Sequence, residues 1–145
     1  MPRNNPGLIT RDDGSHDAVI HMPADLGVDG AWLADWAQTL LWALDRLRSG
    51  AWDTPGEETL DEIQTAINDL EHQLAPRLDG MRDALIRAHF VAGGSYADLA
   101  LALNRRKSTA QYRADKVLKK APSKMEVWAR GTPGPSPTVV EPTQD

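Results

Sequence analysis

Residues 95 to 120 constrain the fold of this chain more than any other stretch, because they combine a marked helix start with a turn and a second helix. Ser95 and Asp98 have the spacing of a capping box, in which each side chain accepts a hydrogen bond from the other residue's backbone N–H. The pattern therefore predicts a helix that begins at Tyr96. Over the next two turns, an apolar stripe is formed by Leu99, Ala100 and Leu103.

A tight turn and a second helix are predicted after this short helix. Asn104 tolerates the left-handed backbone conformation that such a turn requires, as glycine would. Beyond the turn, apolar residues keep a helical period on one side: Ala110, Ala114, Val117 and Leu118. Polar residues take the other side: Arg106, Lys107, Gln111, Tyr112, Asp115 and Lys116. We expect Ala100 and Ala110 to lie where the two helices cross closely, as in a helix-turn-helix.

The wider sequence around the turn has a family resemblance. Before the turn it is carried by a glycine, a Ser-Tyr pair, an acidic residue and a Leu-Ala pair within residues 90–100; after the turn, by Ser108-Thr109-Ala110 and Arg113. These residues resemble the fourth conserved region of bacterial sigma factors, over residues 85–120 only. The resemblance implies recognition of promoter DNA and contact with RNA polymerase.

Site residues follow from the same resemblance. It implies that the residues facing DNA bases are Arg106, Lys107, Ser108, Gln111 and Tyr112. The residues facing phosphates would be Arg105, Arg113 and Lys116. Three positions depart from the family: Asn104 replaces the usual turn glycine, Arg105 an aliphatic residue, and Arg106 the usual serine cap. No upstream segment resembles the family's polymerase-binding and promoter-melting regions, so a complete sigma factor is not expected.

The distribution of charge supports DNA contact more than the net charge of −5 does. Residues 104–130 hold nine Lys or Arg and two acids, about +7, while the rest of the chain carries about −12. All the lysines lie between Lys107 and Lys124. A local basic run is the expected footprint for phosphate contact, and the alternative is a solvated charged helix.

The N-terminal residues offer few apolar anchors. Residues 1–16 are rich in Pro, Asn, Gly and Asp, and we expect a disordered, mobile arm. The apolar run 18–22, ended by Pro23, predicts either a lone strand or an extended segment packed on helices. His21 in this run has no second ligand at metal spacing, so we interpret it as a structural or surface residue.

A long amphipathic helix is predicted from Asp29 or Gly30 to about Gly50. Its apolar residues repeat at threes and fours: Leu33, Trp36, Leu40, Leu44 and Leu47. Trp42 projects on the polar side and needs a different partner. It either packs under the Ala51-Trp52 loop or the N-terminal arm, or belongs to a subunit interface, where tryptophan is enriched. For the second alternative, the candidate dimer or partner interface comprises Trp32, Trp36 and Trp42.

A second long helix is predicted after a capping box at Thr54-Pro55-Gly56-Glu57. It carries a narrow row of apolar residues like that of a two-helix coiled coil, made by Leu60, Ile63, Ile67, Leu70, Leu74 and Leu78. This row should pair with the first helix, which makes residues 17–79 a helical hairpin for dimerisation or partner binding. Pro76 and Gly80 predict a kink or restart, the joint between the hairpin and the residues that follow it.

The remaining segments complete a trihelical DNA-binding unit over residues 80–130. A support helix is predicted from Met81, Leu85, Ala88 and Phe90, and it ends at Gly93-Gly94. His89 near its end is interpreted as a surface or satisfied histidine. Ala121-Pro122 should stop the recognition helix, and three apolar residues could then dock back: Met125, Val127 and Trp128. The Pro-rich residues 131–145 predict a disordered tail.

The composition excludes several classes of protein. Length and a hydrophobic content of 41% suit a single domain or a pair of small ones. Without cysteine there can be no disulfide framework or thiolate metal site, and no apolar signal or membrane-length run is found. We therefore expect a cytoplasmic, nucleoid-associated protein with no metal or cofactor. An enzyme is not expected, because no phosphate-binding glycine loop, metal-ligand cluster or nucleophile with a base is evident.

Together these patterns predict an all-α fold: an N-terminal helical hairpin, a trihelical helix-turn-helix unit and disordered termini. The leading functional interpretation is a sequence-specific, double-stranded DNA-binding transcriptional regulator. It would act as a homodimer, because one module offers too little contact to be both tight and specific. The alternative is an adaptor that binds RNA polymerase, or an assembly subunit, using the same fold without reading DNA. The acidic surface favours that alternative.

Overall fold

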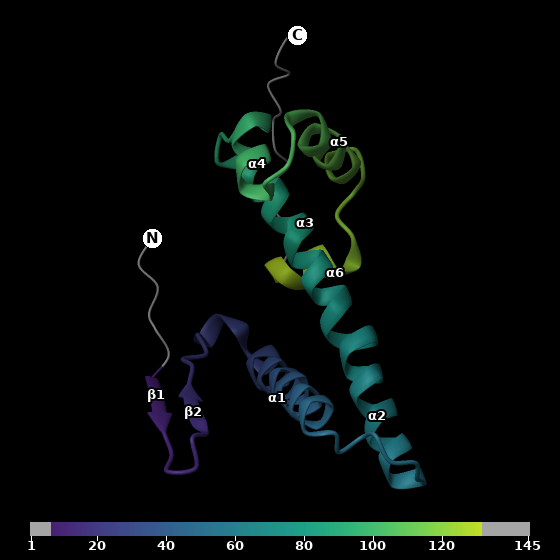
Figure 1. The fold of residues 1–145 in the computed structure, drawn as a ribbon. Helices are drawn as coiled ribbons and strands as arrows, with labels where there is room; N and C mark the ends of the chain where they lie inside the picture. The colour runs from purple at the N-terminus through teal and green to yellow at the C-terminus, as the bar shows by residue number, and fades with distance from the viewer. Residues whose placement is uncertain (1–6, 132–145) are drawn as a thin grey trace. The chain divides into compact units, whose positions relative to one another are not determined.

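The computed structural model describes residues 7–131 and is mainly helical (Figure 1). The chain divides into two compact units, Met1–Asp53 and Thr54–Asp145. This division falls between the two predicted long helices, not at the joint predicted near residue 80. The predicted pairing of these helices into a hairpin stays a prediction, because one helix lies in each unit and the position of one unit relative to the other is not determined. Of the predicted tail, only Gly131 lies within the described residues.

The first unit begins with a β-hairpin. Strands β1 (Gly7–Thr10) and β2 (His16–Val19) are antiparallel. The turn between them is closed by a hydrogen bond of 2.8 Å from the Arg11 N–H to the Ser15 carbonyl. The Asp13 carboxylate accepts a second bond, of 2.9 Å, from the Ser15 N–H. The Ser15 hydroxyl donates to the same carboxylate, and these bonds together lower the pKa of Asp13, the hydroxyl bond most.

The hairpin differs from the arm predicted for residues 1–16 and from the lone strand predicted at 18–22. The missed signal is Asp13-Gly14, a favoured hairpin turn pair, standing between two short apolar runs. Gly14 has a φ of 87°, a left-handed conformation that glycine adopts without strain. Residues 1–6 of the predicted arm lie outside the described residues.

The rest of the first unit is helical. A short 3-10 turn, η1 (Ala24–Leu26), leads into α1 (Val28–Ser49). The predicted first long helix is thus confirmed, and it ends at Gly50 in the left-handed conformation. Trp36 and Ala43 are buried. Other apolar side chains of α1 are exposed, among them Leu40, Leu41, Leu44 and Leu47.

The second unit is built on one long helical path made of three consecutive segments (Figure 1). These are α2 (Glu57–Asn68), the π-helical turn η2 (Asp69–Leu74) and α3 (Ala75–Val91). The predicted capping box at Thr54 is wrong: α2 begins at Glu57 after Gly56, with no side-chain cap. Glycine is a poor helix former, so the helix starts at the first favourable residue.

The predicted kink between Pro76 and Gly80 is replaced by the π turn just before it. In η2 the Ala75 N–H donates to the Leu70 carbonyl five residues back. Proline lacks an N–H and clashes with the carbonyl four residues earlier, so a locally widened turn accommodates it without a break. Gly80 lies buried inside α3.

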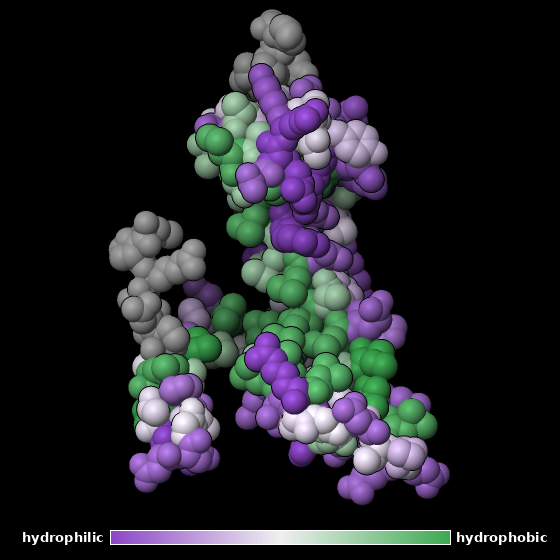
Figure 2. Space-filling model, viewed as in Figure 1, coloured by the Kyte–Doolittle hydropathy of each residue, from purple (hydrophilic) through white to green (hydrophobic). Residues whose placement is uncertain are grey.

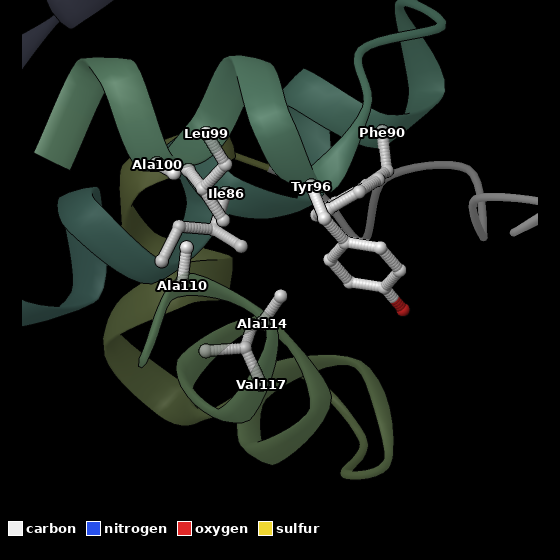
Figure 3. Close-up of a cluster of buried hydrophobic side chains, with 8 residues drawn as sticks. All are labelled: Ile86, Phe90, Tyr96, Leu99, Ala100, Ala110, Ala114 and Val117. Atoms are coloured by element: carbon white, nitrogen blue, oxygen red, sulfur yellow. The ribbon is translucent and has the colours of Figure 1, made fainter. Parts of the chain in front are cut away.

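Three further helices pack on the C-terminal end of this path: α4 (Tyr96–Leu103), α5 (Lys107–Leu118) and α6 (Lys124–Arg130). The predicted support helix ends as expected, at α3's last residue Val91, ahead of Gly93. Side chains from α3, α4 and α5 point toward one another in the hydrophobic core (Figure 3). The core comprises Ile86, Phe90, Tyr96, Leu99, Ala100, Ala110, Ala114 and Val117.

Candidate nucleic-acid interface

The start of α4 is fixed by the predicted capping box. The Ser95 Oγ accepts from the Asp98 N–H at 3.1 Å, and the Asp98 carboxylate accepts from the Ser95 N–H at 3.0 Å. Bonds from Ser95 favour the ionised carboxylate and lower the pKa of Asp98, the backbone bond most. His89 lies with its Nε2 2.9 Å from the Ser95 carbonyl oxygen, so the predicted satisfied histidine joins α3 to α4.

The turn between α4 and α5 has the predicted geometry. Asn104 has φ 51° and ψ 50°, and within residues 7–131 no other non-glycine residue has a positive φ. The Arg105 N–H donates to the Ala100 carbonyl at 3.0 Å, which closes the turn. Arg106 is extended and precedes α5 without a side-chain cap. The segment from α4 to α5 therefore consists of a helix, a tight turn and a second helix, as the sequence predicted.

Small residues let the two helices cross closely. Ala110 and Ala114 are fully buried, and Ala100 is nearly so, as predicted for the crossing point. The Tyr96 hydroxyl donates to the Asp115 carboxylate at 3.1 Å. Asp115, predicted on the open polar side, is instead half-buried in this bond. One face of α5 is thus fixed to the rest of the unit.

The opposite face of α5 and the turn are exposed. The exposed predicted site residues are Arg105, Arg106, Lys107, Ser108, Gln111, Tyr112 and Lys116, while Arg113 is half-buried. The Tyr112 ring is 66% exposed, and the Lys116 Nζ lies 5.5 Å from its centroid. Figure 2 shows hydrophilic residues gathered over the α5 end of this unit. The structure therefore brings all eight predicted residues to one helix and its preceding turn.

A cleft of about 330 Å³ borders this surface on the side of α3 and α6. Its charged lining comprises Asp83, Arg113, Lys116, Lys120 and Glu126. Burial, with a contribution from Glu126, raises the pKa of Asp83, while Arg113 acts in the opposite direction. The three cations suit contact with a phosphate at the edge of α5.

A buried ion pair holds the C-terminal end of α5. The Arg87 Nε donates to a Glu126 carboxylate oxygen at 2.5 Å, and both residues are less than 10% exposed. The same guanidinium donates to the carbonyls of Val117, at 2.6 Å, and Lys120, at 2.7 Å. These carbonyls lie at the end of α5, beyond the regular helical bonding, where a positive charge also complements the helix dipole.

The helix that supplies Glu126 was only partly predictable from the sequence. Met125, Val127 and Trp128 dock back as predicted, but within α6, which has its own capping box between Ser123 and Glu126. Serine followed three residues later by glutamate is a readable signal for this helix start. The burial of Arg87 has no comparable local signal.

The candidate interface tryptophans lie in the first unit. Trp42 packs edge-on against Trp52, with ring centroids 5.2 Å apart. This contact matches the first of the two predicted alternatives, packing within the chain. Trp32 stacks on Trp36 at 6.0 Å and remains 54% exposed.

Within residues 7–131, no group of three or more His, Asp or Glu side chains is placed to hold a metal ion. None of the helices in this range combines the length and hydropathy needed to cross a bilayer. Comparison of the chain with protein-family models, curated proteins and solved structures finds no match to any of them.

Proposed function

We propose that this protein is a sequence-specific, double-stranded DNA-binding transcriptional regulator that reads the major groove with α5. The observation that supports this most is the two-sided character of α5. Its inner face is locked by buried alanines, while its outer face exposes polar and basic side chains beside a tight turn. This is the arrangement of a recognition helix.

Charge supports the same proposal. The basic run identified in the sequence coincides with α5, its preceding turn and the segment that follows it. One of its two acids, Glu126, is neutralised inside the unit by Arg87, and the other, Asp115, is engaged by Tyr96. The cations at this surface can therefore contact phosphates, while residues on the exposed face of α5 read bases. The proposal requires no catalysis and places the protein on the nucleoid in the cytoplasm.

Selection of bound duplexes from a random pool tests the proposal directly. We expect enrichment of a defined motif, and an affinity that falls steeply as salt rises. Absence of duplex binding at low salt would overturn it.

Base readout is tested by Gln111→Ala. We expect this change to weaken binding to the selected site by about 1–3 kcal/mol and to leave non-specific binding nearly unchanged, because a glutamine side chain can bond adenine bidentately. Competition binding with selected and scrambled duplexes measures both. Gln64→Ala, at an exposed glutamine of α2, is the matched control. An equal loss on all sequences would show that Gln111 does not read bases.

Phosphate contact is tested by Lys116→Ala and Arg113→Ala. Each should weaken binding to every duplex alike and reduce the slope of log affinity against log salt by about one, since one counterion fewer is released. Titrations at several salt concentrations give the slope. Arg48→Ala, an exposed charge of α1, serves as control. An unchanged slope would remove that residue from the phosphate contacts.

One observation favours a second candidate, a protein-interaction adaptor that binds RNA polymerase or another assembly. Leu101 on α4 is 82% exposed, whereas Leu99 is buried and Leu103 is half-buried. An isolated exposed leucine beside a helix-turn-helix suits contact with another protein. This candidate would be supported if Leu101→Ser lost binding to RNA polymerase while its duplex binding stayed equal to that of the wild type.

A further inference from the structure

An apolar stripe runs along the long path of α2, η2 and α3. We call it the seam, and it comprises Leu60, Ile63, Ile67, Leu70, Leu74, Leu78, Met81 and Leu85. Five of these are exposed: Leu60 at 53%, Ile67 at 57%, Leu78 at 49%, Met81 at 42% and Leu85 at 63%. On α3 the seam lies opposite the side that holds Gly80, Ala84 and Arg87, which are buried. Figure 2 shows hydrophobic residues at the surface along α2.

The π turn keeps the seam in line. Between Leu60 and Leu74 its residues alternate at threes and fours, the coiled-coil period. Two successive spacings of four, Leu70 to Leu74 to Leu78, then insert one extra residue. A π turn holds about one residue more than an α turn, so η2 absorbs this insertion and Leu78 and Leu85 return to phase. The stripe is therefore continuous over about 38 Å.

The spacing of apolar residues in the seam is nearly the same when the chain is followed in the reverse direction. Reversal about residues 72 and 73, inside the π turn, brings Leu60 opposite Leu85 and Ile67 opposite Leu78. It also brings Ile63 within one residue of the position opposite Met81. An antiparallel two-fold pairing requires this property, because the same surface must meet itself in reverse.

The charges beside the seam favour the antiparallel direction. Residues 57–71 contain six acids and no Lys or Arg. Residues 72–91 contain three arginines and two aspartates, a net charge of about +1. Within this half Arg82 pairs with Asp79, and Arg87 pairs with Glu126. Parallel pairing would set six acids against six acids, whereas antiparallel pairing sets the six acids against a half that carries a net charge of about +1.

We propose that the seam docks a second copy of this chain, antiparallel, with the two π turns at the two-fold axis. Eight apolar side chains from each copy then cover one another. The sequence predicted dimerisation or partner binding for residues 17–79, with Trp32, Trp36 and Trp42 as candidate interface residues; the proposed pairing gives this role to the seam instead of the tryptophans.

This pairing sets the distance between the two DNA-binding units. From the axis to Val91 is about 18 residues of helix, or about 28 Å, so the two α3 ends lie about 56 Å apart. That lies between one turn of DNA, about 34–36 Å, and two turns, about 68–72 Å, and is nearer to two turns. If the proposed DNA-binding function holds, half-sites centred about 20–21 base pairs apart should bind more tightly than half-sites about 10 or 15 base pairs apart. The pairing itself does not depend on that function.

Cross-linking tests the pairing without DNA. The chain has no cysteine, so Leu60→Cys and Leu85→Cys can be made as separate single variants. Under mild oxidation a mixture of the two should give a disulfide-linked dimer, while Leu60→Cys alone should not. Linkage of Leu60→Cys to itself would overturn the antiparallel direction. No linkage in the mixture would overturn the pairing, as expected if a helix of the same chain covered the seam.

Sedimentation of the full chain gives the second measurement. The wild type should be a dimer at tens of micromolar, and Ile67→Glu should raise the dissociation constant about 30-fold or more, as for a central interface residue. Thr65→Glu adds the same charge to an exposed position of α2 off the seam and should leave the dimer intact. Circular dichroism checks that both variants remain helical. A monomeric wild type, or equal effects of the two variants, would overturn the proposal.

Discussion

Glu126→Leu is expected to lower the free energy of unfolding by about 3–5 kcal/mol, because it leaves the Arg87 guanidinium buried without a counter-charge. The two side chains are only 10% and 5% exposed, so water cannot replace the lost partner. The change also removes half of the capping box of α6. Chemical denaturation followed by circular dichroism measures the loss.

A double variant separates the buried charge from the loss of packing. Arg87→Met combined with Glu126→Leu removes both charges, and replacing a buried ion pair by apolar residues is often nearly neutral. We therefore expect the double variant to be more stable than Glu126→Leu alone. A single variant that loses less than about 1 kcal/mol would show that the pair does not hold the unit together.

Gly80→Ala is expected to be the second large effect, a loss of about 1–3 kcal/mol in the free energy of unfolding. By helix propensity alone this change would stabilise α3 by up to about 1 kcal/mol. Here, however, a Cβ on Gly80 would lie 2.5 Å from the Met125 carbonyl carbon and 2.7 Å from its oxygen. Backbone atoms cannot rotate away, so α6 must move off α3. The sign of the effect therefore reports on this helix contact.

Gly30→Ala is the matched control for that prediction. Gly30 is also helical and buried, but a Cβ there would meet the Met22 side chain at 3.6 Å, an ordinary contact. The free energy of unfolding of Gly30→Ala should equal that of the wild type or exceed it slightly. Denaturation of both variants under one condition decides the case, and equal stability of the two would contradict the close approach of α6.

Local sequence signals predicted the start of α4 and the turn that follows it well. The capping box at Ser95 and the left-handed turn at Asn104 each depend on residues close in sequence, and both are present. The crossing alanines were predictable because a buried period of three and four needs small residues at a close approach. Seven of the eight predicted DNA contacts are exposed and Arg113 is half-buried, but whether they touch DNA stays a prediction.

Features that depend on distant partners were not predictable in this way. Arg87 looks like any charged residue of an amphipathic helix until Glu126, 39 residues later, is placed beside it. The π turn follows from a one-residue change in the spacing of apolar side chains, and Pro76 alone indicated a kink instead. The β-hairpin did have a local signal, Asp13-Gly14, which the low apolar content around it obscured.

The contact between Arg87 and the end of α5 also bears on how the protein is made. The ribosome releases Arg87 long before Glu126, so the arginine must stay hydrated while α4 and α5 emerge. If the arginine were buried before Glu126 was available, its charge would be desolvated without a counter-charge. If it stayed hydrated, the carbonyls at the end of α5 would lack the hydrogen bonds that Arg87 donates. We therefore expect the second unit to close only after α6 has been synthesised, as a late step of cotranslational folding.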